Sequence, residues 1–268
     1  MSFMTAKIAP AANPLVKPLI VEGLSKSYGT GDSAIKVLSN LNLRVDPGEI
    51  ISIVGPSGAG KTTLLRCLSG LLAPTAGSVH VGDTRVSEPQ PEIGLVFQDY
   101  RGSLMPWMRA ADNVAFPLEG KGVPKAQRLE RARACLADVG LPDSGDRYPW
   151  ELSGGMQQRV AIARALAYDA HILLMDEPFG SLDAQTRFEL EDLVMALRKR
   201  LRISIIVVTH DIDEAVYLAD RVIVLSGHPA SVIDTVTVDL GEDRDQIKTK
   251  SIPRFAEYRS RILSEIRG

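Results

Sequence analysis

Eight residues, Gly55 to Thr62 (GPSGAGKT), combine three glycines with a lysine and a threonine in the pattern of a phosphate-binding loop. The apolar stretch EIISIVG leads into them, and the helical pattern KTTLLRCLSGLL begins at their end. Gly55, Gly58 and Gly60 allow backbone N–H groups to wrap around phosphates, and a helix N-terminus adds a favourable dipole. We expect the other loop residues to line the same site: Pro56, Ser57 and Ala59.

Three polar side chains at the end of this loop can act on a nucleoside triphosphate. Lys61 is expected to reach the β- and γ-phosphates, and the Thr62 hydroxyl is expected to bind Mg²⁺. Thr63 is placed to touch the α-phosphate. The alternative is an ordinary glycine-rich turn between a strand and a helix, with an exposed lysine.

An acidic pair follows a second apolar stretch, HILLMDEP. Four apolar residues carry Asp176 to the carboxyl end of a predicted strand, where open α/β sheets bind their ligands. Asp176 would hold Mg²⁺ through water, and Glu177 would act as general base on the attacking water. The alternative is that the pair caps a helix N-terminus, a role that Pro178 would suit.

Two more polar residues end predicted strands. His210 follows ISIIVVT and can contact the γ-phosphate or orient Glu177; the alternative is a simple polar strand end. Gln98 follows IGLVF and can sense Mg²⁺ and the attacking water; the alternative is an exposed turn residue. The remaining histidines have no ligand spacing and receive no role: His80, His171 and His228.

Composition narrows the class of protein. The 268 residues carry a formal charge of −2 without a basic run, which disfavours nucleic acid as the main partner. Cys67 and Cys135 lie in apolar helical patterns and are expected to be reduced thiols. The sequence has neither a zinc-type cluster nor a Gly-x-Ser-x-Gly elbow, and no stretch approaches the roughly 20 apolar residues of a membrane span.

The elements that must position these residues predict an α/β fold. Continuous apolar runs alternating with amphipathic helices around 183–201 and 211–219 indicate a mostly parallel core sheet. Alternating patterns broken by Gly, Asn and Asp indicate antiparallel strands near the N-terminus, and residues from about 99 to 152 indicate an inserted helical subdomain. We therefore divide the chain into a flexible leader (1–17), one domain (18–232) and a short tail (233–268).

A second octet, Leu152 to Arg159 (LSGGMQQR), opens a helix with adjacent glycines. A glycine inside a helix costs about 1 kcal/mol relative to alanine, so some close approach must require it. The octet contains no obvious nucleophile, metal cluster or acid–base pair, so on its own it does not name the approaching group.

Together these motifs resemble an ATP-binding-cassette (ABC) ATPase, a P-loop NTPase, over residues 19 to 225. They stand in family order: SKSYG with Tyr28, GPSGAGKTT, Gln98, LSGGMQQR, HILLMDEP, GSLD with Asp183, and His210. The resemblance implies that Tyr28 stacks on adenine and that two cassettes dimerise head to tail. Ser153, Gly154 and Gly155 of one chain would then present bare N–H groups and a helix dipole to the γ-phosphate of the ATP held by the other chain, an approach that side chains would block. Asp183 would carry contacts across the interface.

Details of the resemblance indicate import. Two segments resemble the nitrate/sulfonate/taurine-type importer ATPases: QDYRGSLMPW, and RYPWELSGGMQQRVAIARALA, which contains the second octet. This implies a homodimer docked on separate membrane permeases at the cytoplasmic face, served by a solute-binding protein. The candidate docking surface is the segment 99–116, with Leu104 to Trp107; the alternative is an ordinary helix–loop segment of the core. Two alternatives stay open: a soluble ABC ATPase acting on nucleic acid or ribosomes, and a nucleotide-binding regulator with little turnover.

Overall fold

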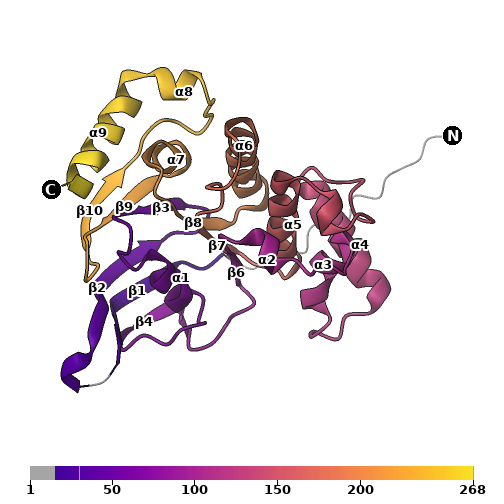
Figure 1. Ribbon diagram of the computed structural model, residues 1–268, viewed down its shortest axis with the longest axis horizontal. Helices are drawn as coiled ribbons and strands as arrows, with labels where there is room; N and C mark the ends of the chain where they lie inside the picture. Colours follow the sequence, from indigo (N-terminus) through magenta and orange to yellow (C-terminus); the bar gives the residue numbers. More distant parts are fainter. Residues whose placement is uncertain (1–15, 30, 268) are drawn as a thin grey trace.

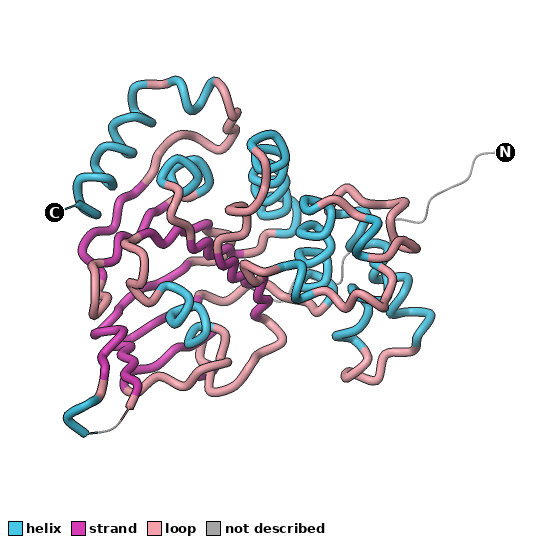
Figure 2. Tube along the Cα trace, in the orientation of Figure 1, coloured by secondary structure: helices cyan, strands magenta, loops and turns pink. Residues whose placement is uncertain are grey.

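The computed structural model describes residues 16–29 and 31–267 of the chain (Figure 1). The predicted leader, 1–17, therefore lies outside the described residues except for its last two positions. Figure 2 shows strands gathered at the centre, with helices above them and a separate group of helices at the side away from the C-terminus.

A six-stranded sheet forms the centre of the fold, and its strand order is β10-β9-β3-β8-β7-β6. All neighbouring pairs are parallel except β9 and β10. Every residue of β3, β7 and β8 is buried, as their continuous apolar sequences predict. The bounds are β3 Ile50–Val54, β6 Ile93–Val96, β7 Ile172–Asp176, β8 Ser204–Val208, β9 Arg221–Leu225 and β10 Val232–Thr237.

The two faces of this sheet pack into two different cores. Ile51 and Ile53 face the core shared with α1 and the N-terminal sheet, whereas Ile50 and Val54 face the core shared with the helices above. These helices are α6 (Ala184–Leu201), α7 (Ile212–Leu218) and α9 (Pro253–Arg267) (Figure 1). Because successive side chains of a strand point to opposite faces, the sheet packs between two layers.

The predicted antiparallel strands form a second, four-stranded sheet of order β2-β1-β4-β5. All three pairings are antiparallel, which confirms the prediction. The bounds are β1 Leu19–Tyr28, β2 Ile35–Val45, β4 Ala76–Val81 and β5 Thr84–Arg85, with a 3₁₀ turn at Gly31–Ser33. Helix α1 (Lys61–Leu68) lies between the two sheets in Figure 1.

Helix α1 is shorter than its sequence pattern, which extends to Leu72. It ends before Gly70, whose φ is +75° and whose position has room for no Cβ: that atom would lie 2.3 Å from the Glu88 carbonyl oxygen. A glycine in the left-handed conformation just past the last turn is a common helix stop.

Between β6 and α5 the described chain is helical. The elements are α2 Tyr100–Ser103, α3 Ala110–Ala115, a 3₁₀ turn Phe116–Leu118, α4 Lys125–Asp138 and a 3₁₀ turn Pro149–Glu151. Helix α5 (Gly154–Ala167) packs against α2, α3 and α4 and also contacts β6 and α6. Ala132, Leu136 and Val139 are fully buried and Leu129 is partly buried, so the apolar face expected from their spacing exists.

The C-terminal segment is part of the fold rather than an appendage. The expected boundary at 232/233 falls inside β10, which pairs with β9 and forms the edge strand of the core sheet. Helices α8 (Lys248–Ser251) and α9 follow, and Phe255 and Ile262 of α9 are buried against α7, β9 and β10. Among the described helices, none has the length and apolar character to cross a membrane.

Candidate functional site

The glycine-rich loop joins the carboxyl end of β3 to the first turn of α1. Gly58 and Gly60 adopt positive φ angles of +77° and +88°. A Cβ at Gly60 would lie 2.7 Å from Val37 Cγ1, and one at Gly55 would lie 2.9 Å from the Leu225 carbonyl oxygen. Close neighbours therefore exclude a side chain at Gly55 and at Gly60.

A cavity of about 740 Å³ opens over this loop. Ten predicted residues line it: Ser57, Gly58, Ala59, Gly60, Lys61, Thr62, Thr63, Gln98, Glu177 and His210. Two further residues line it that sequence reasoning missed, Val37 and His228. Residues from the carboxyl ends of β3, β6, β7, β8 and β9 thus meet at one edge of the sheet, as expected for an open α/β fold.

Lys61 is buried beneath the loop rather than exposed, so the alternative of an exposed lysine is wrong. Its Nζ donates to the carbonyl oxygens of Gly55 and Pro56, at 2.9 Å each. Burial lowers the pKa of this ammonium, opposed by the negative charges of Glu177 and Asp176. The loop carbonyls therefore hold the buried ammonium in place.

Asp176 ends β7 and is only 7% exposed. Burial raises the pKa of this carboxyl, and a hydrogen bond with the Thr62 side chain opposes that change. A hydroxyl and a carboxylate oxygen side by side are the ligand type that Mg²⁺ prefers. Among the described residues no group of three His, Cys, Asp or Glu side chains is able to hold a metal, so phosphate oxygens and water would have to complete the shell.

Two predicted residues meet at one carboxylate oxygen of Glu177. Its Oε2 accepts a hydrogen bond from Gln98 Nε2 at 3.2 Å and lies 3.2 Å from His210 Nδ1. The Glu177 backbone has a positive φ of +43°, a strained conformation for a residue with a side chain. The next helix in the described chain begins at Ala184 and is capped by Asp183, so the alternative of an acidic helix cap at 176–177 is wrong.

The other predicted residues lie outside this cavity. Tyr28 ends β1 and is 43% exposed, with Lys26 Nζ 5.4 Å from its ring centroid. Ser153 caps α5 and accepts from Met156 N at 3.3 Å. Asp183 caps α6 and accepts from Thr186 N at 3.0 Å and from Thr186 Oγ1 at 2.7 Å; these bonds lower its pKa. Some predicted residues of the chain therefore line the cavity, whereas Tyr28, Ser153 and Asp183 do not.

A neighbouring side chain of the same chain leaves no room for a Cβ at Gly155. It is buried, and a Cβ there would lie 2.3 Å from Thr186 Cγ2 on α6. The sequence interpretation attributed the need for glycine to an approaching phosphate; the structure instead provides a neighbouring helix that excludes the side chain. The first turns of α5 and α6 are therefore packed directly together.

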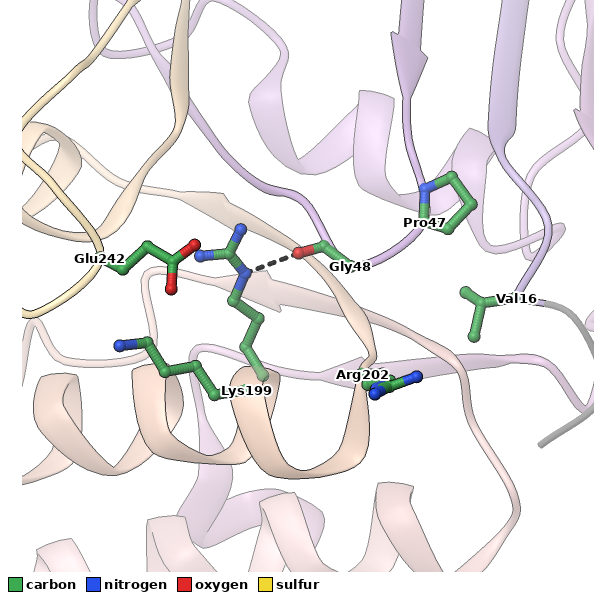
Figure 3. A pocket seen from close by; sticks show the side chains of 7 residues that line it. Val16, Pro47, Gly48, Lys199, Arg202 and Glu242 are labelled. Carbon is green, nitrogen blue, oxygen red and sulfur yellow. Dashed lines mark hydrogen bonds between the residues drawn. The ribbon is translucent and has the colours of Figure 1, made fainter. Parts of the chain in front are cut away.

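A second cavity, of about 520 Å³, lies at the opposite edge of the core sheet, beside the residues that precede β3 and β8 (Figure 3). Arg198 is prominent there, but its Nε already donates to the Gly48 carbonyl at 2.6 Å and its Nη2 to Asp220 Oδ2 at 2.7 Å. Lys199 is paired with Asp243 at 2.8 Å. These cations are engaged within the protein, and we assign this cavity no role.

Comparisons with known proteins agree with this geometry. Residues 38–180 match the family described as "ABC transporter". The chain is 41% identical to the nitrate import ATP-binding protein NrtD of Synechocystis, over 93% of this chain and 95% of that protein, and 40% identical to the taurine import ATP-binding protein TauB of Pseudomonas putida, over 92% and 95%. A solved ATP-binding cassette, dimeric in a post-hydrolysis state with ADP and Pi, is 34% identical, with a TM-score of 0.71 over 82% of this chain and 99% of that one.

Proposed function

The chain belongs to the ABC transporter family, as an ATP-hydrolysing cassette, and from this premise we propose that it energises the uptake of a small solute such as nitrate, a sulfonate or taurine. The observation that carries the proposal is the convergence of Gln98 and His210 on Glu177 beside the phosphate-binding loop. The names of the relatives support the direction of transport and the class of solute.

In the proposed reaction Glu177 accepts a proton from the water that attacks the γ-phosphate. Gln98 and His210 hold the carboxylate in place, and Lys61 with the loop N–H groups binds the β- and γ-phosphates. Thr62 and Asp176 would hold Mg²⁺, which neutralises developing charge on the phosphate oxygens when it is bound. The oxygen chemistry of these two residues fits that ion.

The active unit would be a head-to-tail homodimer. Ser153 and Asp183 cap exposed helix N-termini away from the chain's own cavity, and a helix N-terminus is a ready anion site. The dimeric relative supports pairing of two chains. Each ATP would then lie between the loop of one chain and Ser153 to Gly155 of its partner.

A groove of about 400 Å³ in the helical region is the proposed docking site for a permease. Trp107 lines it and is 70% exposed. Asn113 fixes the loop that carries Trp107, because its side chain accepts from Met105 N at 2.8 Å and donates to the carbonyls of Met105 and Met108 at 3.0 Å each. Leu104, expected to belong to this surface, is instead buried in the core.

Co-purification tests the proposal. The chain should purify from membranes with its permease, so it would lie on the inner face of the cell membrane, and a periplasmic or extracellular solute-binding protein should stimulate its ATPase activity in vesicles. Trp107→Ala should weaken permease capture, whereas Ile247→Ala, which changes a residue 79% exposed outside the groove, should not. Recovery of nucleic acid or ribosomes in place of a permease would instead support the soluble, non-transport alternative.

A further inference from the structure

The turn between β9 and β10 carries His228 to the wall of the nucleotide cavity. Ser226 and Ser231 hold this turn closed: Ser226 N donates to the Ser231 carbonyl at 2.9 Å, and Ser231 N donates to Ser226 Oγ at 2.8 Å. Ser226 Oγ also donates to the Pro229 carbonyl at 3.2 Å. The position of His228 is therefore set by a hydrogen-bonded turn and not by a free loop.

The same turn is attached to both flanks of the phosphate-binding loop. Ala230 N donates to the Val37 carbonyl and Ser39 N donates to the Ala230 carbonyl, at 2.8 Å each, so the turn is joined to β2. Gly55 approaches the Leu225 carbonyl so closely that a Cβ would lie 2.9 Å away. The turn, the start of β2 and the glycine-rich loop consequently form one wall, in which Val37 and His228 face the cavity.

Strand order gives the cavity two chemically different ends. Gln98, Glu177 and His210 follow β6, β7 and β8, which all lie on one side of β3 in the sheet. His228 follows β9, on the other side of β3. A triphosphate bound along the loop with its γ-phosphate beside Glu177 must therefore direct its nucleoside end toward His228 and Val37.

We propose that His228 is a nucleotide-recognition residue whose imidazole N–H donates to the nucleoside end of bound ATP, at a ribose hydroxyl or an α-phosphate oxygen. The inference rests on ATP occupying the cavity as in the proposed function. An imidazole always offers at least one N–H donor, and both candidate acceptors are oxygens. Since His228 lies across the loop from Glu177, its contact would be made equally in ATP and in ADP.

The test compares nucleotide affinities of the full chain by titration calorimetry. His228→Ala should weaken the binding of ATP and of ADP by the same factor, about three- to tenfold, as expected for one hydrogen bond. KM for ATP should rise by that factor, whereas kcat should change far less. His228→Gln keeps an N–H donor and should restore most of the affinity, and His80→Ala, on β4 away from the cavity, serves as matched control.

2′-Deoxy-ATP and 3′-deoxy-ATP distinguish the two acceptors. If a ribose hydroxyl accepts the bond, the wild-type protein prefers ATP over the matching deoxynucleotide and His228→Ala loses that preference. If an α-phosphate oxygen accepts it, wild type and variant show the same preference. Unchanged affinity for both ATP and ADP in His228→Ala overturns the inference, as does a loss for ATP alone. Normal ATP binding by Lys61→Ala would instead overturn the nucleotide site itself.

Discussion

His210 Nδ1 and Gln98 Nε2 both lie 3.2 Å from the same oxygen of Glu177, Oε2. Two strand ends that flank β7, one from β6 and one from β8, thus fix the carboxylate from either side. Among the residues that the structure describes, none is seen to hydrogen-bond Oε1, and we expect this oxygen to face the attacking water. We therefore expect turnover to depend more strongly on this carboxylate than on the two side chains that position it.

Glu177→Gln should bind ATP but hydrolyse it at least about 100-fold more slowly, because it removes the general base while preserving size and hydrogen bonding. Single-turnover hydrolysis and ATP titration measure the two effects separately. The variant should also accumulate as an ATP-bound dimer in gel filtration. Glu242→Gln, an exposed carboxylate at the opposite edge of the sheet, is the control. A monomeric Glu177→Gln protein in saturating ATP would contradict the dimer.

Mixing two inactive variants tests whether each nucleotide site combines Lys61 of one chain with Ser153 of the other. Lys61→Ala should abolish ATP binding, since it removes the buried ammonium from beneath the loop. Ser153→Arg should keep ATP binding by the isolated chain and block hydrolysis. A mixed pair has one intact site, built from the loop of the Ser153→Arg chain and Ser153 of the Lys61→Ala chain. ATPase activity should therefore reappear on mixing; continued inactivity would place both residues in the same chain's site.

Gly155→Ala should destabilise the protein despite the better helix propensity of alanine. Propensity favours alanine by about 1 kcal/mol, but overpacking costs about 1–3 kcal/mol, and the new Cβ would lie 2.3 Å from Thr186 Cγ2. That methyl is held in place because Thr186 Oγ1 donates to Asp183 Oδ2 at 2.7 Å. Thr186→Ser keeps the hydroxyl and removes the methyl, so the double variant should recover stability in urea unfolding. A neutral single variant would show that no such contact restricts this position.

Glu214 should make stability depend on pH. It is buried on α7, and burial raises the pKa of its carboxyl from 4.5 to about 8, with Glu191 and Asp211 adding to the rise and Thr209 and Arg187 opposing it. Between these two values the native state binds more protons than the unfolded state, so the free energy of unfolding falls as pH rises and levels off above about pH 8. The loss is on the order of a few kcal/mol.

Urea unfolding at several values between pH 5 and pH 8.5 measures this dependence. Glu214→Gln removes the titrating group at similar volume, so its stability should decline less with pH than that of the wild type. Glu257→Gln, an exposed carboxylate on α9, should keep the wild-type profile. Parallel profiles for wild type and Glu214→Gln would contradict the assignment.

Sequence pattern predicted those features that depend on local chemistry. Continuous apolar runs predicted β3, β7 and β8. The polar residues at the carboxyl ends of β7 and β8 drew attention to Asp176, Glu177 and His210. His228 was missed because its proximity to the loop comes from β9 pairing with β3, and no spacing within the chain records that pairing. The role of β10 was missed for a similar reason, since its alternating sequence gains meaning only as a partner for β9.

The packing of Gly155 on Thr186, and of Thr186 on Asp183, has a consequence for a pair of chains. The first turns of α5 and α6 are packed together, so we expect Ser153 and Asp183 to move together whenever one of them is displaced. In the proposed dimer, hydrolysis of one ATP would then change the interface that both nucleotides share. Occupancy of one site would therefore change the affinity of the other site for ATP.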